Sequence, residues 1–159
     1  APNWGGLFAA CACGDVDGVA AALGDGADPN EVLLDGDATT AVHLAAESGH
    51  TDCLRAVVRG GGLVLARTDE DATPIMFAAQ GGHAAAVAYL LATPGVDHSL
   101  RSELDGGTPL FAACQEGHVE VLRLLVGAGA DPEVPADDGT TPLLIACQEG
   151  HQEVVEALL

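Results

Sequence analysis

The sequence contains no lysine, and arginine supplies all five of its basic residues. Set against 24 acidic residues, this gives a formal net charge of −19 at pH 7. Nucleic-acid backbones and anionic membranes repel a surface of this sign, so we expect no binding to nucleic acid or to membranes. If the chain has charged partners, the sequence predicts that they are basic.

Aromatic residues and long apolar runs are also scarce. Aromatics make up 3% of the chain although 48% of its residues are hydrophobic, so a core has to be built from Ala, Val and Leu. That composition suits thin layers of stacked helices better than a large globular interior. No stretch approaches the roughly 18 consecutive apolar residues of a membrane-spanning helix, and no signal-peptide pattern is visible at the start.

The five cysteines lack any paired spacing such as Cys-x-x-Cys. An odd number of unpaired cysteines indicates a reducing compartment, because disulfides form mainly in oxidising ones. We therefore expect an intracellular protein, either cytoplasmic or nuclear.

What the sequence does contain is an eleven-residue motif that recurs along its whole length. Residues 108–118 read TPLFAACQEGH, 141–151 read TPLLIACQEGH, 73–83 read TPIMFAAQGGH and 40–50 read TAVHLAAESGH, with a degenerate copy at 5–15. Successive copies start 35, 33, 35 and 33 residues apart. A fixed period near 33 residues is typical of a repeat protein in which each unit stacks on its neighbours.

The chemistry of one copy predicts a pair of helices. Thr108 can cap a helix through its hydroxyl, and Pro109 suits the first helical position, where its missing N–H costs nothing. Gly117 can take the left-handed conformation that ends a helix. A second apolar helix is predicted over residues 119–125, and the sequence Gly-Ala-Asp-Pro at 129–132 then ends it.

On these motifs the sequence resembles the ankyrin-repeat family over essentially the whole chain. The resemblance implies an all-α solenoid of helix-turn-helix units joined by hairpin-like loops. We expect one domain over residues 1–159 that is part of a longer protein. Its five repeats are predicted at about 1–34, 35–67, 68–102, 103–135 and 136–159, the first degenerate and the last truncated.

Histidine and cysteine recur at fixed motif positions without indicating a metal site. His50, His83, His118 and His151 occur once per repeat, and neighbouring repeats are about 10 Å apart whereas zinc–nitrogen bonds are about 2 Å long. One histidine per repeat cannot share a metal ion without further ligands, so we expect these residues to be structural. His43 is also predicted to brace the stack. Cys11, Cys114 and Cys147 share a motif position that holds alanine elsewhere, which favours a small, buried side chain.

No group of residues indicates catalysis. The acidic stretches at 15–18 and 69–71 lack the spacing of a calcium loop, and the sequence has neither a glycine-rich phosphate loop nor a Gly-x-Ser-x-Gly motif. We therefore expect no enzyme activity, no catalytic residue, no cofactor and no metal.

Acidic residues concentrate at the positions that ankyrin-like proteins usually use to bind partners. These are the hairpin tips and the exposed end of the first helix: four, three and one residues before the motif threonine, and seven and eight after it. Nine of the 25 such positions are acidic and none is basic, against 15 acids at the other 134 positions. The predicted binding residues are these acids with flanking glutamine and apolar residues: Trp4, Asp37, Glu47, Asp69, Glu70, Leu104, Asp105, Gln115, Glu116, Asp137, Asp138, Gln148 and Glu149.

Two interpretations of this acidity remain open. Tips and helix ends are the wettest positions, and acids also favour a helix N-terminus, so the enrichment can arise from solvation alone. The complete lack of arginine at the 25 positions favours a functional face instead. The prediction is a monomeric, non-catalytic protein-interaction module whose acidic concave face binds a basic protein segment or surface. The alternative is a structural spacer or scaffold within a larger protein, including a larger enzyme, with acidity serving solubility. A methyl-lysine reader is disfavoured, because its cage needs several aromatic residues.

Overall fold

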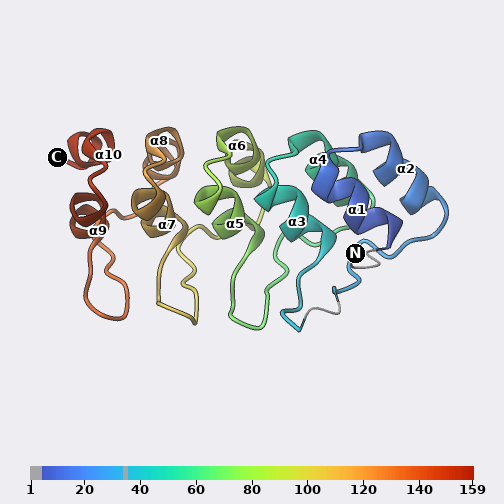
Figure 1. Ribbon diagram of the computed structural model, residues 1–159, viewed down its shortest axis with the longest axis horizontal. Helices are drawn as coiled ribbons and strands as arrows, with labels where there is room; N and C mark the ends of the chain where they lie inside the picture. Colours follow the sequence, from blue (N-terminus) through green and yellow to red (C-terminus); the bar gives the residue numbers. More distant parts are fainter. Residues whose placement is uncertain (1–4, 34–35) are drawn as a thin grey trace.

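The computed structural model describes residues 5–33 and 36–159, which form ten α-helices arranged in two layers (Figure 1). The first layer holds α1 (Gly6–Cys13), α3 (Ala41–Glu47), α5 (Pro74–Gln80), α7 (Pro109–Glu116) and α9 (Pro142–Glu149). The second holds α2 (Val16–Gly24), α4 (Thr51–Arg59), α6 (Ala84–Ala92), α8 (Val119–Gly127) and α10 (Gln152–Leu158). The all-α repeat solenoid that the family resemblance implies is confirmed.

The ends of the helices follow the predicted chemistry. The hydroxyl of Thr108 accepts a hydrogen bond of 3.2 Å from the N–H of Phe111, and Pro109 is the first residue of α7. Gly117 ends that helix with φ +82°. The Thr141 hydroxyl caps α9 in the same way, through the N–H of Leu144 at 3.3 Å. Satisfying these otherwise unpaired N–H groups fixes where α7 and α9 begin.

Small and aliphatic residues build the core, as the composition predicts. Ala45, Ala78, Ala113 and Ala146 share one motif position and are all fully buried, which lets the first helices of neighbouring repeats approach closely. Leucine and valine fill the space between the two layers, and Leu54, Leu90, Leu110, Leu122 and Leu125 are among the largest fully buried side chains.

One cysteine departs from the expectation of a small, buried side chain. Cys11 and Cys114 are buried, but Cys147 at the same motif position is exposed. The difference arises because α1 and α7 are each covered by the first helix of the next repeat, whereas no further helix of this chain packs on α9.

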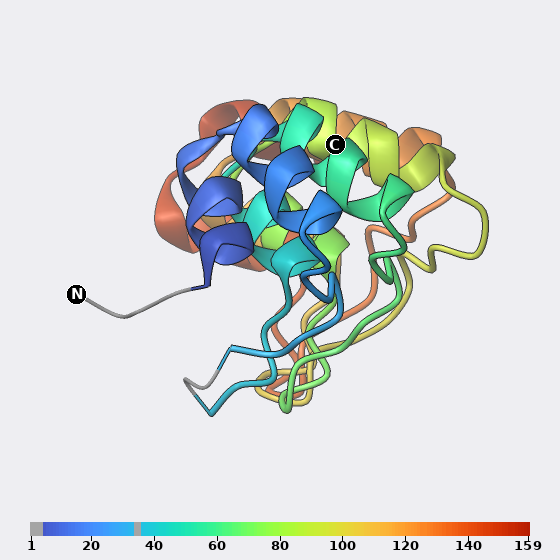
Figure 2. The same ribbon diagram turned by 90° about the vertical axis from the view of Figure 1, so that its right-hand side faces the viewer.

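The loops between repeats project from the first layer as narrow tips, which gather along one side of the molecule (Figure 2). Each tip is closed by a main-chain hydrogen bond across its base, from Leu33 to Thr39 (2.8 Å), Thr68 to Ala72 (3.0 Å), Ser102 to Gly107 (3.0 Å) and Ala136 to Thr140 (2.8 Å). Among the residues described, none of the helices is long and apolar enough to cross a membrane.

Candidate partner-binding face

Main-chain hydrogen bonds join each tip to the next and set its acidic residues in a row. The N–H of Asp69 bonds to the carbonyl oxygen of Asp37 at 3.2 Å. The same bond joins Glu103 to Glu70 and Asp137 to Asp105, each at 2.9 Å. The backbone therefore holds the tips at a regular spacing. Several of the acids predicted as binding residues lie on this row.

The recurring histidines tie the first helices together, next to the other predicted positions. His83 Nε2 donates to the carbonyl oxygen of Glu47 at 2.7 Å, and His118 Nε2 donates to that of Gln80 at 2.8 Å. Each bond runs from the N-cap residue of a second helix to the end of the first helix of the preceding repeat. These contacts place the histidines in the stack and account for their occurrence once per repeat.

His43 is fully buried and belongs to the scaffold as well. Its Nδ1 accepts hydrogen bonds from the N–H and the hydroxyl of Thr40, at 3.2 and 2.9 Å, and its ring contacts Phe77 edge-on with centroids 5.4 Å apart. Burial lowers the pKa of His43, although the backbone carbonyls of Ala72 and Ala66 act in the opposite direction. The ring is therefore held neutral as a helix-capping acceptor.

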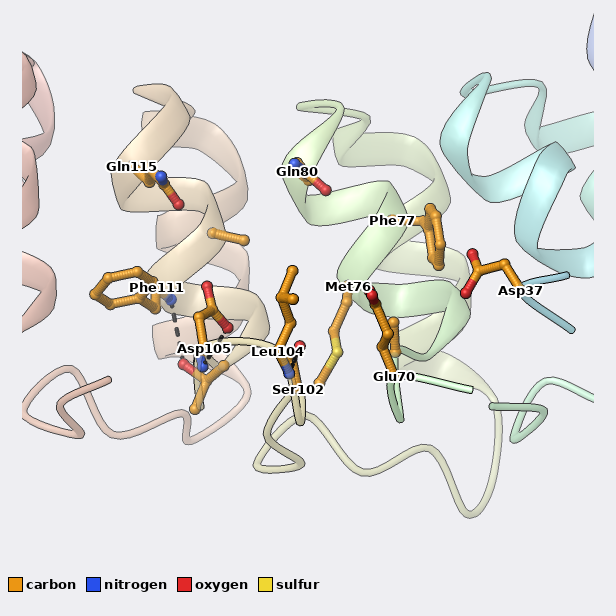
Figure 3. A pocket seen from close by; sticks show the side chains of 14 residues that line it. Asp37, Glu70, Met76, Phe77, Gln80, Ser102, Leu104, Asp105, Phe111 and Gln115 are labelled. Carbon is orange, nitrogen blue, oxygen red and sulfur yellow. Dashed lines mark hydrogen bonds between the residues drawn. The ribbon is translucent and has the colours of Figure 1, made fainter. Parts of the chain in front are cut away.

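A groove of about 250 Å³, here called the first groove, lies between α5 and α7 and the tips that precede them (Figure 3). Its apolar lining comes from Met76, Phe77 and Leu104, and Leu104 is 71% exposed. Carboxylates of Glu70 and Asp105 flank Leu104 in Figure 3. Asp37 and the amide groups of Gln80 and Gln115 complete the polar lining. The groove thus combines an apolar surface with an acidic rim.

A second groove of about 370 Å³ lies one repeat further along, between α7 and α9. It shares Leu104, Asp105, Phe111 and Gln115 with the first groove, so α7 and its tip separate the two. Its other side is formed by Ala136, Asp137, Asp138, Thr140, Ile145 and Gln148. The hydrogen bonds that the Asp138 carboxylate accepts from Thr140 lower the pKa of Asp138, so this carboxylate stays charged at neutral pH.

Arg101 bridges two tips and pairs with Asp137, which lines the second groove. Its guanidinium donates to the carbonyl oxygens of Gly106 at 2.8 Å and Pro135 at 3.0 Å, and it pairs with the carboxylate of Asp137 at 2.9 Å. The sequence places Arg101 outside the 25 predicted positions, yet its side chain neutralises one acid within them. The first groove contains no basic residue in its lining.

The structure brings only part of the predicted set together. The predicted residues that line one or both grooves are Asp37, Glu70, Leu104, Asp105, Gln115, Asp137, Asp138 and Gln148. Glu47, Asp69, Glu116 and Glu149 are exposed but line neither groove. Trp4 lies outside the described residues.

Apart from Leu104, which is in the predicted set, the apolar lining of the grooves was not predicted from the sequence. Met76 and Phe111 are 7% and 5% exposed, and they occupy the motif position that holds His43 in another repeat. Their edges nevertheless reach the grooves. The available signal was Leu104, a large apolar residue at a tip where neighbouring copies carry Asp69 and Asp137.

Comparison with known proteins identifies the family. A sequence model of ankyrin repeats, three copies long, matches residues 7–102 and 94–159. The chain therefore belongs to the ankyrin-repeat family, as its motifs predict. Ankyrin repeats generally mediate protein–protein interactions, and their homologues are typically interaction modules without enzymatic activity.

Individual relatives share the repeat but are much longer. The chain is 35% identical over 94 residues to ankyrin repeat and KH domain-containing protein mask-1 of Caenorhabditis elegans, covering 59% of this chain and 4% of that protein. It is 33% identical over 135 residues to zinc finger CCCH domain-containing protein 50 of Oryza sativa, covering 81% of this chain and 17% of that protein. Ankyrin repeat protein nuc-2 of Neurospora crassa is 31% identical over 93 residues, covering 58% of this chain and 9% of that protein. The chain thus spans a small fraction of each.

Proposed function

We propose that this chain is a non-catalytic protein-interaction module that binds a basic protein segment through its acidic concave face. The observation that carries the proposal is the first groove, where an apolar lining meets the carboxylates of Glu70 and Asp105 and no basic residue is part of the lining. Apolar contact supplies affinity in such a site, while the surrounding charge speeds encounter and selects the sign of the partner.

The acidic face is also held in a fixed arrangement before any partner arrives. The bonds between tips and the histidine contacts between first helices both run along the face. A surface that is already ordered loses little conformational entropy on binding, which leaves more of the contact energy for affinity. This supports a binding role over a purely solvating one.

The test compares two variants that carry the same net charge. The first replaces three groove acids, Glu70→Gln, Asp105→Asn and Asp138→Asn. Asparagine at positions 105 and 138 keeps a side-chain oxygen. The oxygen at 105 still accepts a hydrogen bond from the N–H of Gly107, and the oxygen at 138 still accepts one from the N–H of Thr140. The control replaces three acids of the second helices, Asp52→Asn, Glu120→Gln and Glu153→Gln. Both variants remove three negative charges, but only the first removes them from the grooves.

Fluorescent basic peptides are titrated into the wild type and both variants at low and at moderately high salt. We expect a subset of these peptides to bind, with salt weakening the complex. The groove variant should bind about tenfold more weakly at low salt, because each exposed ion pair contributes about 0.2–1 kcal/mol. Equal losses in both variants would show that the charge acts generically, and would favour the spacer interpretation.

A further inference from the structure

The two grooves lie side by side and share a wall, which suggests a partner that occupies both. Leu104, Asp105 and Gln115 line the first groove on one side and the second groove on the other. Their volumes, about 250 and 370 Å³, lie on either side of the lower end of the roughly 300–1,000 Å³ range of small-molecule pockets. Each has room for a single side chain rather than for a folded element.

The lining of both grooves fits a long side chain that ends in a planar cation. Apolar residues, Leu104 in both and Met76 or Ile145 beside it, can contact an aliphatic stem. Carboxylates and glutamine carbonyl oxygens at the rim can then accept hydrogen bonds from the cationic group at its end. Arginine fits this better than lysine, because its guanidinium presents several donors in a fixed plane and is more weakly hydrated.

The spacing of the grooves restricts how the two cations are placed in the partner. Helices packed side by side have axes about 8–10 Å apart, and the grooves alternate with the packed helices α5, α7 and α9. In a polyproline II segment, residues three apart point to the same side and are separated by about 9 Å. In a β-strand, residues on the same side are about 7 or 13 Å apart. The polyproline II repeat is therefore the one that matches the grooves.

We infer that the concave face reads an Arg-x-x-Arg segment in the polyproline II conformation, with one guanidinium in each groove. This inference rests on the proposed function and adds the residue type and the spacing that the face selects. The first groove is the stronger of the two sites. Glu70 and Asp105 in its lining have no ion pair with an arginine, whereas Asp137 of the second groove already pairs with Arg101 at 2.9 Å.

The experiment uses proline-rich peptides of identical composition that carry two arginines. Proline keeps the host in the polyproline II conformation, so only the spacing of the arginines changes. One peptide has them three residues apart, another two apart and a third four apart. A fourth peptide has two lysines three apart. Each is titrated into the full chain, into Glu70→Gln and into the control Glu120→Gln, with binding followed by fluorescence anisotropy.

The three-residue spacing should bind about fivefold more tightly than either other spacing and than the lysine peptide, since only that peptide fills both grooves with guanidinium groups. Glu70→Gln should abolish this preference, and Glu120→Gln should keep it. Equal affinity for all three spacings, or a preference that survives Glu70→Gln, would overturn the inference. Equal binding of the lysine peptide would overturn the choice of arginine.

The two proposals fail in different ways. If the peptides bind without regard to spacing and the variant with three groove acids replaced still loses affinity, the acidic face is correct and the Arg-x-x-Arg inference is wrong. If no peptide binds, or if the groove variant binds as well as the wild type, the proposed function is wrong and the inference falls with it.

Discussion

The imidazole Nε2 of His151 lies 2.8 Å from the main-chain oxygen of Gln115, whose side chain lines both grooves. The stacking contact and the candidate binding site therefore meet in one residue. His118 makes the equivalent bond to Gln80, which lines the first groove. The histidines that hold the repeats together thus also fix the positions of the helix ends on the concave face.

Replacing one of these histidines should loosen the stack. His118→Ala removes the 2.8 Å hydrogen bond to the carbonyl oxygen of Gln80, and we expect the free energy of unfolding to fall by about 1 kcal/mol. Urea titration followed by circular dichroism measures the change. A variant as stable as the wild type would show that the bond between neighbouring repeats contributes nothing to the stack.

Two glycines offer a matched pair for separating backbone strain from crowding. Gly117 and Gly150 both have positive φ, +82° and +77°, so alanine costs about 1–2 kcal/mol of strain at either position. A Cβ at Gly117 would also lie 2.5 Å from Nδ1 of His151, whereas nothing lies within 4 Å of one at Gly150. Gly117→Ala should therefore destabilise the protein more than Gly150→Ala in urea denaturation. Equal losses would mean that the His151 ring moves aside freely.

Two of the five thiols should react readily with a thiol reagent, and the other three should be protected. Cys13 and Cys147 are exposed, and Cys11, Cys53 and Cys114 are buried. Burial raises the pKa of Cys11 and of Cys114 to about 12, so neither forms the reactive thiolate in the native protein near pH 8. Ellman's reagent should therefore titrate two thiols rapidly, and the other three only after denaturation. Fast reaction of a third thiol would contradict the described packing.

The same shift predicts how alkali affects stability. A thiol with a native pKa of about 12 and an ordinary value of 9.0 loses its proton more readily in the unfolded chain. Its stabilising contribution is therefore complete below pH 9 and is lost as the pH rises towards 12. The double variant Cys11→Ala, Cys114→Ala should show a smaller loss of unfolding free energy between pH 8 and about 10.5. An identical loss in the wild type and the variant would exclude these two thiols as its source.

Arg101 should have opposite effects on stability and on binding. Arg101→Gln breaks the link to Pro135 and Asp137 in the next tip, so we expect a loss of about 1 kcal/mol in unfolding free energy. The freed Asp137 carboxylate should raise the affinity for basic peptides about twofold. The control is Arg67→Gln, because Arg67 pairs with Asp71 within its own tip at 3.1 Å. Unchanged or weaker peptide binding in Arg101→Gln would contradict a role for Asp137 in the second groove.

Local chemistry made most of the fold predictable from the sequence. The Thr108 cap and the Gly117 helix end each depend on contacts within a few residues of their own position, so the sequence predicts them and the structure confirms them. The repeat motif also indicated which positions carry acids. Whether those acids bind a partner remains a prediction.

The grooves could not be predicted in the same way, because each is formed by residues of neighbouring repeats. Leu104 and Phe77 lie 27 positions apart in the sequence, and the pair becomes a lining only when the tip of one repeat lies beside the first helix of another. Arg101 and Asp137 are 36 positions apart, and their contact depends on the conformation of two loops. Counting acids at the motif positions shows that Asp137 is present. It does not show that Arg101, which is distant in the sequence, neutralises the Asp137 carboxylate.

Apart from the Arg101 bridge, the bonds that join one tip to the next run from main-chain N–H to main-chain carbonyl oxygen and involve no side chain. Any residue except proline can supply the donor, so the side chains on these tips can be exchanged without breaking the connection. The framework and its specificity are thus separable. A designer could rewrite the acids into another pattern, one tip at a time, and keep the same spacing between recognition positions.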